Sequence, residues 1–349
     1  MSFANSILPQ GPHDFIFGNF PNHTVASILI SSAGRRVELL ACFRQAAQAL
    51  GRPLRIIATD AVPAWSPACV MADHAETVPR CTSPGFLPAM MEICRKHQVR
   101  LIVPTIDTEL PVYAHHRKTF EEMGVQVLVA DPEIIGIIRD KSATAHFLAA
   151  RGIPGPRTWT VAECLSQRAE IPWPVFVKPR AGSGSKGTFL AHAPETIESA
   201  ANPESLTVQE HCAGDEFTIN AFLDGQGRAV SCVPHRREFV RDGEVCFAET
   251  QRIAAFTEAA NGIASAWPSY YGPLCFQGFR DSNQQIRVFE INGRFGGGYP
   301  ICDHAGGTFA RWILQRLWNL TPDYHDAWRE GVRMLRYDAA VFTEEDQRC

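Results

Sequence analysis

Strand-forming and helix-forming segments alternate through the first part of the chain, and this alternation limits the possible folds more than any other feature. Residues 25–31 (VASILIS) are apolar and β-branched, which predicts a buried strand. Residues 36–50 then carry apolar side chains at helical spacing. Because such alternation implies right-handed crossovers and a parallel sheet, residues 24–130 predict a doubly wound α/β domain. Its other expected strands are 54–59, 101–104 and 125–129, and its other expected helices are 85–97 and 110–123.

The pattern changes after residue 130. Residues 131–151 are predicted to be largely helical and to end before a Gly-Ile-Pro sequence, with Asp140-Lys141-Ser142 at the head of a helix. Short strands and long strands then dominate, which predicts an α+β region with antiparallel sheets over residues 131–320. Residues 1–23 are interpreted as an extension and 321–349 as a C-terminal segment. The expected strands are 175–178, 187–192, 206–210, 216–223, 229–240, 244–253, 274–279 and 286–291, and the expected helices are 194–201, 257–267 and 308–318.

Composition argues against several classes of protein. The 349 residues carry a net charge of −4, whereas a protein that binds the phosphate backbone is usually strongly basic, so no nucleic-acid partner is expected. No apolar run approaches the roughly 18–20 residues needed to cross a bilayer, so no membrane partner is expected. The N-terminus lacks the pattern of a signal peptide, and the 11 cysteines form no CxxC pair. Reduced thiols and a cytoplasmic location are therefore expected.

A glycine- and serine-rich string, KPRAGSGSKG, begins at Lys178 and ends at Gly187. It contains GxGxxG, but a dinucleotide-binding fingerprint needs a helix after the loop, and TFLAHA predicts a strand. A P-loop is excluded because no GxxxxGK[ST] is present. Backbone N–H groups of such a loop can close over a triphosphate, with the lysine as a point charge. A plain hairpin loop is the alternative.

A second group lies near residue 290. Glu290 and Asn292 are two apart on an expected strand, so both side chains point to one face. A hairpin centred between residues 283 and 284 would pair Gln277 with Glu290. These three oxygen-bearing side chains suit a hard cation such as Mg²⁺. Arg294 and the glycines after it could steady a transferring phosphoryl group. The alternative is an ordinary polar strand face.

Other polar segments are less specific. The string VQEHCAGDE ends an expected strand at Glu210 and begins another at Glu216, and it could contact a base and a ribose, although an acidic surface turn is the alternative. Polar residues also follow the expected parallel strands, at the edge where open α/β sheets bind ligands. They are Arg35, Arg36, Asp60, Asp107 and Glu109, and the string His235-Arg236-Arg237 could add a clamp for a carboxylate or phosphate.

Four strings in this order, DKSATAHFLAARGIP, PVFVKPRAGSGSKG, VQEHCAGDE and FEINGRFGGGYP, resemble the ATP-grasp superfamily. The likeness is greatest to the carbamoyl-phosphate synthase large-subunit type and to stand-alone carboxylate–amine ligases, and it runs from about Ile28 to about Leu317. It implies a pre-ATP-grasp domain at 24–130 and an ATP-grasp domain at 131–320, with a small lid at about 157–208 and ATP clamped between two antiparallel sheets.

The resemblance also implies roles for individual residues. Lys141 and Lys178 would contact ATP phosphates, and Arg294 would stabilise an acyl phosphate. Gln277 departs from most of the family, which has an acidic residue there, but it agrees with the carbamoyl-phosphate synthase branch. The remaining implied residues are Gly182, Ser183, Gly184, Ser185 and Gly187 for the loop over the phosphates, Gln209, Glu210 and Cys212 for adenine, Glu216 for ribose, and Glu290 and Asn292 for magnesium.

The sequence therefore predicts an ATP- and Mg²⁺-dependent ligase that joins a small-molecule carboxylate to an amine through an acyl phosphate, and the resemblance implies a homodimer. One alternative is a kinase-type enzyme that phosphorylates a carboxylate or carbamate without forming an amide. Another is a non-catalytic ATP-binding regulatory protein. A nicotinamide-dependent oxidoreductase rests on the GxGxxG string alone.

Overall fold

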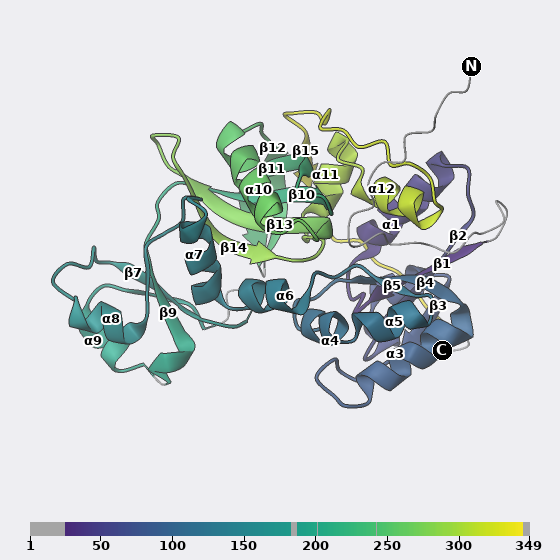
Figure 1. Ribbon diagram of the computed structural model, residues 1–349, viewed down its shortest axis with the longest axis horizontal. Coiled ribbons are helices and arrows are strands. Elements are labelled where there is room, and N and C mark those ends of the chain that lie inside the picture. Colours follow the sequence, from purple (N-terminus) through teal and green to yellow (C-terminus); the bar gives the residue numbers. More distant parts are fainter. Residues whose placement is uncertain (1–24, 183–186, 201, 242, 345–349) are drawn as a thin grey trace, which may run out of the picture.

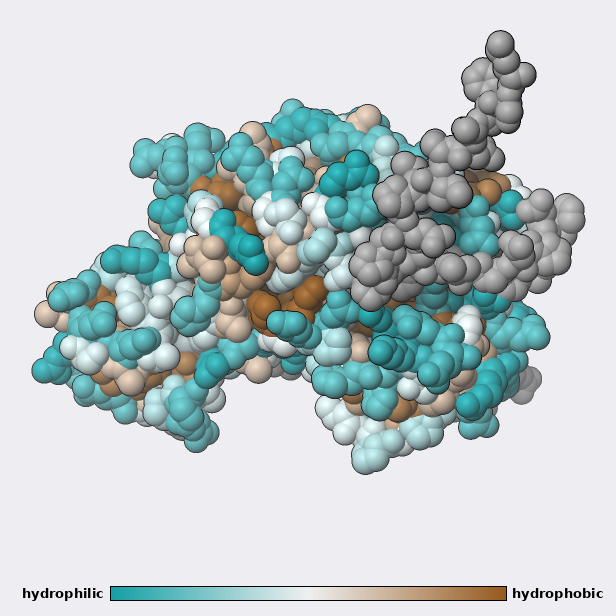
Figure 2. Space-filling model, viewed as in Figure 1, coloured by the Kyte–Doolittle hydropathy of each residue, from teal (hydrophilic) through white to brown (hydrophobic). Residues whose placement is uncertain are grey.

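The structure is a computed structural model, and it describes residues 25–182, 187–200, 202–241 and 243–344. The described chain forms three sheets (Figure 1). The first sheet belongs to the N-terminal part, the largest sheet lies at the centre, and the smallest forms a lobe at the far end. Figure 2 shows a notch between this lobe and the N-terminal part, with hydrophobic side chains over α6 (Pro132–Arg139) where the two parts approach each other.

The N-terminal sheet is parallel throughout and has the strand order β3-β2-β1-β4-β5. β1 lies at its centre, and all six of its residues are buried, as its β-branched composition predicts. The strands are β1 (Ala26–Ser31), β2 (Leu54–Asp60), β3 (His74–Thr77), β4 (Val99–Pro104) and β5 (Gln126–Val127). The helices are α1 (Val37–Ala49), α2 (Pro67–Met71), α3 (Phe86–His97), α4 (Leu110–His115) and α5 (Arg117–Glu122).

The central sheet is antiparallel and has the order β14-β13-β10-β11-β12-β15. Its strands are β10 (Asp215–Asp224), β11 (Ala229–Arg241), β12 (Glu244–Thr250), β13 (Tyr271–Arg280), β14 (Ile286–Asn292) and β15 (Arg333–Leu335). Helices α6 (Pro132–Arg139), α7 (Lys141–Ala150), α10 (Ala254–Ala266), α11 (Tyr299–Ala305) and α12 (Phe309–Leu317) accompany it.

The small sheet is also antiparallel and has the order β6-β9-β7-β8. It has a hydrophobic core of its own, built around Val175, Val177 and Val208. Its elements are β6 (Thr158–Trp159), α8 (Val161–Ser166), β7 (Val175–Pro179), β8 (Phe189–Ala191), α9 (Pro194–Glu198) and β9 (Leu206–Glu210). The predicted fold class is confirmed, whereas the predicted domain boundaries stay predictions.

The largely helical segment 131–151 consists of two helices, α6 and α7. Asp140, predicted at the head of a helix, has an extended backbone (φ −110°, ψ 113°), and its carboxylate accepts hydrogen bonds from the N–H groups of Ser142 and Ala143. An aspartate that caps a new helix in this way ends the preceding one. The expected helix 110–123 was wrong in its continuity, because it is interrupted at His116 (φ −106°, ψ 12°).

The hairpin of β13 and β14 contains the residue pair that the sequence predicts at the candidate metal site. Gln277 pairs with Glu290, as expected. The turn, however, is centred one half-residue earlier, because Arg280 pairs with Ile286, and a bulge after Gln277 restores the predicted pair.

The hydrophobic cores join the first two sheets. One buried cluster contains Leu29 and Ile102 of the parallel sheet together with Phe217 and Phe276 of the central sheet. A second cluster centres on Phe222, whose ring lies within 6 Å of Tyr271, Phe309, Trp312 and Tyr324. These shared cores hold the polar end of β4 against the end of β14. No helix among the described residues has the length and apolar character that crossing a membrane requires.

The aromatic cluster gives a stability prediction. Phe222→Ala should lower the free energy of unfolding by about 3–5 kcal/mol, because it leaves a cavity among packed rings. Urea unfolding measures the loss. Phe342→Ala is the matched control, since Phe342 is 90% exposed and its loss should change stability by less than about 0.5 kcal/mol. Equal effects of the two substitutions would contradict the packing described.

Candidate functional site

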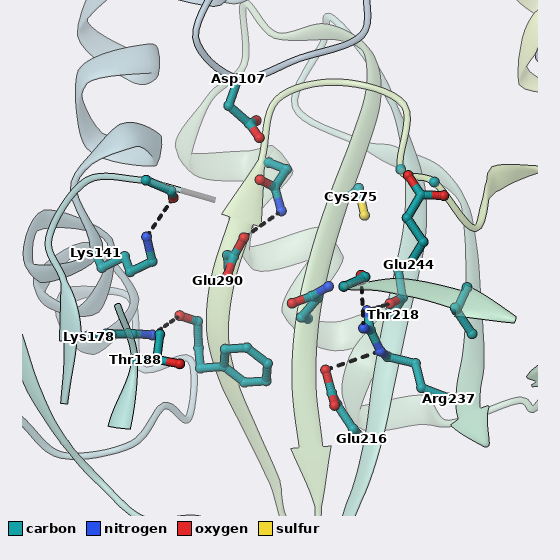
Figure 3. A pocket seen from close by; sticks show the side chains of 18 of the residues that line it. Asp107, Lys141, Lys178, Thr188, Glu216, Thr218, Arg237, Glu244, Cys275 and Glu290 are labelled. Carbon is teal, nitrogen blue, oxygen red and sulfur yellow. Dashed lines mark hydrogen bonds and ion pairs between the residues drawn. The ribbon is translucent and has the colours of Figure 1, made fainter. Parts of the chain in front are cut away.

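A cavity of about 600 Å³ lies between the small sheet and the central sheet. Figure 3 shows its side chains converging from both sheets. Lys141 and Lys178 lie on one side of Glu290, and Cys275 and Glu244 lie on the other. The structure brings most of the predicted site residues to this cavity, namely Lys141, Lys178, Gly182, Gln209, Glu210, Cys212, Glu216, Gln277, Glu290, Asn292 and Arg294.

The start of one helix and the end of one strand position the two lysines. Lys141 is the first residue of α7, and its Nζ donates to the backbone oxygen of Gly182 at 2.8 Å. Lys178 lies near the end of β7 and is 4% exposed. Its Nζ donates to the backbone oxygen of Phe289 at 3.4 Å and lies 5.4 Å from the centre of that ring.

The electrostatics of the lysines favour an anionic ligand. Burial lowers the pKa of Lys178 to about 8, although Glu290 opposes the shift, and nearby Lys141 adds to it. Burial also lowers the pKa of Lys141, again opposed by Glu290. A bound phosphate would stabilise both charged ammonium groups.

Oxygen-bearing side chains face the lysines from β13 and β14. Glu290 and Asn292 share one face of β14, and Asn292 Nδ2 donates to Glu290 Oε1 at 3.2 Å. Gln277 is the cross-strand neighbour of Glu290. Within the described residues no group of three or more His, Cys, Asp or Glu side chains is arranged to hold a metal ion. One carboxylate and two amide oxygens nevertheless form a hard donor set that fits Mg²⁺ when phosphates supply the other oxygens.

Arg294 joins this group to the N-terminal sheet. Its Nη2 donates to Asp107 Oδ2 at 2.7 Å, and the two side chains are 13% and 6% exposed. Burial alone would lower the pKa of Arg294, but Asp107 and then Glu290 raise it above its ordinary value. Arg294 Nε and Asp107 Oδ1 are buried without a hydrogen-bond partner among the described residues. The ion pair therefore uses only part of the hydrogen-bonding capacity of these two buried groups.

A buried carboxylate, Glu109, shapes the loop that carries Asp107. Its Oε1 accepts from the backbone N–H groups of Thr105 at 2.7 Å and Ile106 at 3.2 Å. Its Oε2 accepts from the hydroxyls of Ser31 at 2.6 Å and Ser32 at 2.8 Å. Burial raises the pKa of Glu109, and these donors oppose the shift. Glu109, predicted as a possible substrate contact, therefore lies behind the cavity wall and holds it.

The three glycines after Phe295 are required by close packing. A Cβ on Gly296 would lie 2.6 Å from the sulfur of Cys275, and one on Gly298 would lie 2.5 Å from Nε2 of His235. A Cβ on Gly297 would lie 3.0 Å from the Glu244 carboxylate. Glycine thus lets the backbone lie directly against the central sheet and line the cavity.

The segment predicted to contact a base and a ribose lies at the cavity, with its side chains already engaged. Gln209 Nε2 donates to Thr158 Oγ1 at 3.0 Å. Glu210 Oε2 accepts from the backbone N–H of Arg157 at 3.2 Å. Glu216 forms an ion pair with Arg237 at 3.2 Å, and burial raises the pKa of Glu216 while Arg237 opposes this.

Several predicted residues lie elsewhere. Gly187 is described but does not line the cavity. Asp60 accepts from the backbone N–H of Gly34 at 3.0 Å and does not line it either. Arg236 pairs with Glu238 and Asp215. His235 is fully buried behind Gly298, and burial followed by Arg237 lowers its pKa to about 3. Ser183, Gly184 and Ser185 lie outside the described residues, so their role stays a prediction.

The lining residues that the sequence analysis did not single out include Thr188, Thr218, Glu244 and Cys275. Thr218 pairs with Gln277 across β10 and β13. The sequence alone could not predict this contact, because it depends on the pairing of two strands that are far apart in sequence. Glu244 begins β12, and nothing in its local sequence marks it as a site residue.

Comparisons with known proteins match two parts of the chain to families. The family described as "PylC-like, N-terminal domain" matches residues 28–128, and the family described as "ATP-grasp in the biosynthetic pathway with Ter operon" matches residues 202–340. The biotin carboxylase domain of Hydrogenobacter thermophilus 2-oxoglutarate carboxylase, solved with MgADP, ADP and bicarbonate, superposes with a TM-score of 0.70 at 16% identity. The superposition covers 89% of this chain and 74% of that one. An L-amino acid ligase from Bacillus licheniformis gives a TM-score of 0.64 at 17% identity, covering 84% of this chain and 74% of that one. Residues 202–340 are thus similar to an ATP-grasp family and residues 28–128 to a PylC-like N-terminal domain, and the two solved structures share the fold.

Curated relatives share parts of the chain. A formate-dependent phosphoribosylglycinamide formyltransferase from Synechococcus sp. is 34% identical over 185 residues, which is 51% of this chain and 43% of that protein. An L-arginine-specific L-amino acid ligase from Bacillus subtilis is 26% identical over 255 residues, which is 65% of this chain and 59% of that protein. The chain thus spans about half the length of these two relatives.

The Asp107–Arg294 pair gives a second prediction. Asp107→Ala should lower the free energy of unfolding by about 3–5 kcal/mol, because it leaves a buried guanidinium without its counter-charge. The double variant Asp107→Ala/Arg294→Met should lose less than the sum of the two single variants, as measured by urea unfolding. Strictly additive losses would contradict the coupling.

An exposed ion pair provides the matched control. Asp338 pairs with Arg241 at 2.6 Å, and the two side chains are 80% and 53% exposed. Asp338→Ala should change the free energy of unfolding by less than about 1 kcal/mol.

Proposed function

We propose that this protein is an ATP- and Mg²⁺-dependent ligase that joins a small-molecule carboxylate to an amine through an acyl phosphate. One observation carries the proposal: Lys141, Lys178, Glu290, Asn292 and Arg294 line a single cavity between two antiparallel sheets. Cations for phosphate, oxygens for a divalent ion and an arginine for developing charge are the parts that phosphoryl transfer requires. The relatives include named ligases, which supports the same reaction class.

Each residue has a distinct task in this proposal. Lys141 and Lys178 bind phosphate oxygens and neutralise their charge. Glu290, Asn292 and Gln277 would hold Mg²⁺, which would supply positive charge to neutralise phosphate oxygens. Arg294, fixed by Asp107 at 2.7 Å, directs its guanidinium toward the transferred phosphoryl group. Gln209, Glu210, Cys212 and Glu216 would bind the nucleoside.

The reaction has two steps. A carboxylate oxygen of the acid attacks the γ-phosphorus of ATP, and ADP leaves with the bond electrons. The amine then attacks the acyl carbon, and inorganic phosphate leaves while the amine loses a proton. In both steps the protein contributes positioning and a fixed electrostatic environment. A dimer and a cytoplasmic location stay predictions.

The carboxylate of Glu290 gives a third prediction. Glu290→Ala should lower the rate of acid-dependent ADP release at least about 100-fold, because the one carboxylate among the proposed Mg²⁺ ligands is lost. The assay measures ADP with Mg²⁺ across a panel of amino acids and other small carboxylates, with hydroxylamine as the amine. Hydroxamate formation reports the acyl phosphate. The exposed Glu258 of α10 is the control, and Glu258→Ala should retain full activity.

The outcomes separate the candidate functions. ADP release with hydroxamate in the wild type supports the ligase. ADP release without hydroxamate indicates a kinase-type reaction, and no release with any acid despite ATP binding indicates a regulatory protein. Wild-type activity in Glu290→Ala would contradict the assignment of the metal ligands.

The pKa of Lys178 gives a fourth prediction. ATP binds the charged ammonium, so affinity should be steady below the pKa of about 8 and should fall by up to about 10-fold per pH unit above it. In Lys178→Arg the guanidinium stays charged, so this fall should disappear. Equilibrium titration with a fluorescent ATP analogue between pH 7.5 and 9.5 measures both. A wild-type affinity that is constant over this range would contradict the role of Lys178.

A further inference from the structure

A second cavity of about 190 Å³ adjoins the first. Arg36, Glu244, Ile106, Gly296 and Gly297 line both cavities, so the two meet along this wall. The second cavity is smaller than the roughly 300–1,000 Å³ typical of pockets for drug-sized ligands, so it suits one small group rather than a second nucleotide. Its apolar lining consists of Ala33, Leu39, Ile106, Tyr299 and Pro300.

Opposite charges lie side by side where the cavities meet. Arg36 Nη1 lies 3.7 Å from Glu244 Oε1, and the two side chains are 21% and 35% exposed. Arg336 holds Glu244 from the other side, because its Nη1 donates to Glu244 Oε2 at 2.8 Å and its Nη2 donates to the backbone oxygen of Gly297 at 2.6 Å. Glu244 is therefore fixed by Arg336, while its contact with Arg36 is long.

The negative charge around Arg36 does not balance its burial and the neighbouring arginines. Burial lowers its pKa first, Glu244 opposes this, and the neighbouring Arg294 and Arg336 add to the lowering. An anion beside Arg36 and Arg294 would relieve this repulsion. That position borders the cavity that holds Glu290 and Asn292, where the acid must present its carboxylate.

Glu244 offers the acid a negative charge beside Arg36. Among the described residues it is the one carboxylate that lines both cavities. The pKa of Glu244 is lowered: burial opposes this, but Arg36 and then Arg336 outweigh it, so the carboxylate is charged at neutral pH. Arg35, Arg36 and Arg336 line the second cavity together with Glu38, so both signs of charge are present there, and a cationic group at the junction would be attracted to Glu244.

We infer that the acid substrate is a free α-amino acid, whose carboxylate lies on Arg36, whose ammonium lies on Glu244, and whose side chain enters the second cavity. A guanidinium and a carboxylate 3.7 Å apart are the complement of a zwitterion, whose carboxylate and ammonium are attached to the same carbon. This inference rests on the proposed function. Glu244 also keeps the α-nitrogen protonated, so that nitrogen does not attack its own or another acyl phosphate, and the amine of the second substrate remains the nucleophile.

Binding measurements on the wild type test the inference without requiring turnover. The full-length chain is saturated with Mg²⁺ and a non-hydrolysable ATP analogue and titrated calorimetrically with the standard α-amino acids. Each amino acid is compared with its deaminated acid and its amide, for example L-leucine with 4-methylpentanoate and L-leucinamide. At least one amino acid should bind at least about 10-fold more tightly than both of its analogues. Deaminated acids that bind as tightly, or a panel in which nothing binds, would overturn the inference.

Variants then locate the ammonium. Glu244→Gln should weaken binding of that amino acid at least about 10-fold and leave the deaminated acid and the ATP analogue unaffected. Glu249→Gln is the matched control, because Glu249 lies on the same strand, pairs with Arg333 and lines neither cavity. It should bind all ligands like the wild type. Unchanged selectivity in a folded Glu244→Gln would overturn the assignment, and the comparison of ligands decides the question if that variant does not fold.

Failure of the inference and failure of the proposed function give different results. Amino acids that bind selectively but release no ADP would leave the subsite in place and overturn the ligase. ADP and hydroxamate formed from acids without an α-ammonium, and not from amino acids, would support the ligase and overturn the zwitterion subsite.

Discussion

The buried ion pair between Asp107 and Arg294 is the contact on which the site depends. Asp107 follows a strand of the parallel sheet, and Arg294 follows β14 of the antiparallel sheet, so the pair joins two separately formed layers at the cavity. Removing both charges from water is costly, and the pair persists because the shared hydrophobic cores hold the sheets together. Glu109 supports the same loop from behind. The position of the guanidinium is therefore set by the fold as a whole.

The other cationic side chains at the cavity have too little negative charge around them, and anionic ligands would supply it. Burial lowers the pKa values of Lys141 and Lys178, and Glu290 is the main group that opposes this. Burial likewise lowers the pKa of Arg36, and Glu244 opposes this. Each end of the cavity thus has cations whose charged forms gain from a bound anion. Phosphates at one end and a carboxylate at the other would bring the two reactants together at Arg294. The same electrostatic logic accounts for both proposed binding regions.

The sequence predicted most of the fold because its signals are local. Alternating strands and helices identified the parallel sheet, and residue spacing paired Gln277 with Glu290. The prediction was wrong in the continuity of helix 110–123, which is interrupted at His116, where no proline or glycine marks the break. Glu244 was missed because its place in the site depends on strands and loops that meet only in the folded chain. The Asp107–Arg294 contact spans 187 residues and has no local signal.

Transfer of oxygen from the acid to phosphate is the most direct test of the central claim. An acid that supports turnover is labelled with ¹⁸O in its carboxylate, and the phosphate released after amide formation is analysed by mass spectrometry. An acyl phosphate requires one carboxylate oxygen to leave with phosphorus, so the account predicts phosphate that carries one ¹⁸O. Unlabelled phosphate, with both labelled oxygens retained in the acid or its product, would contradict the account.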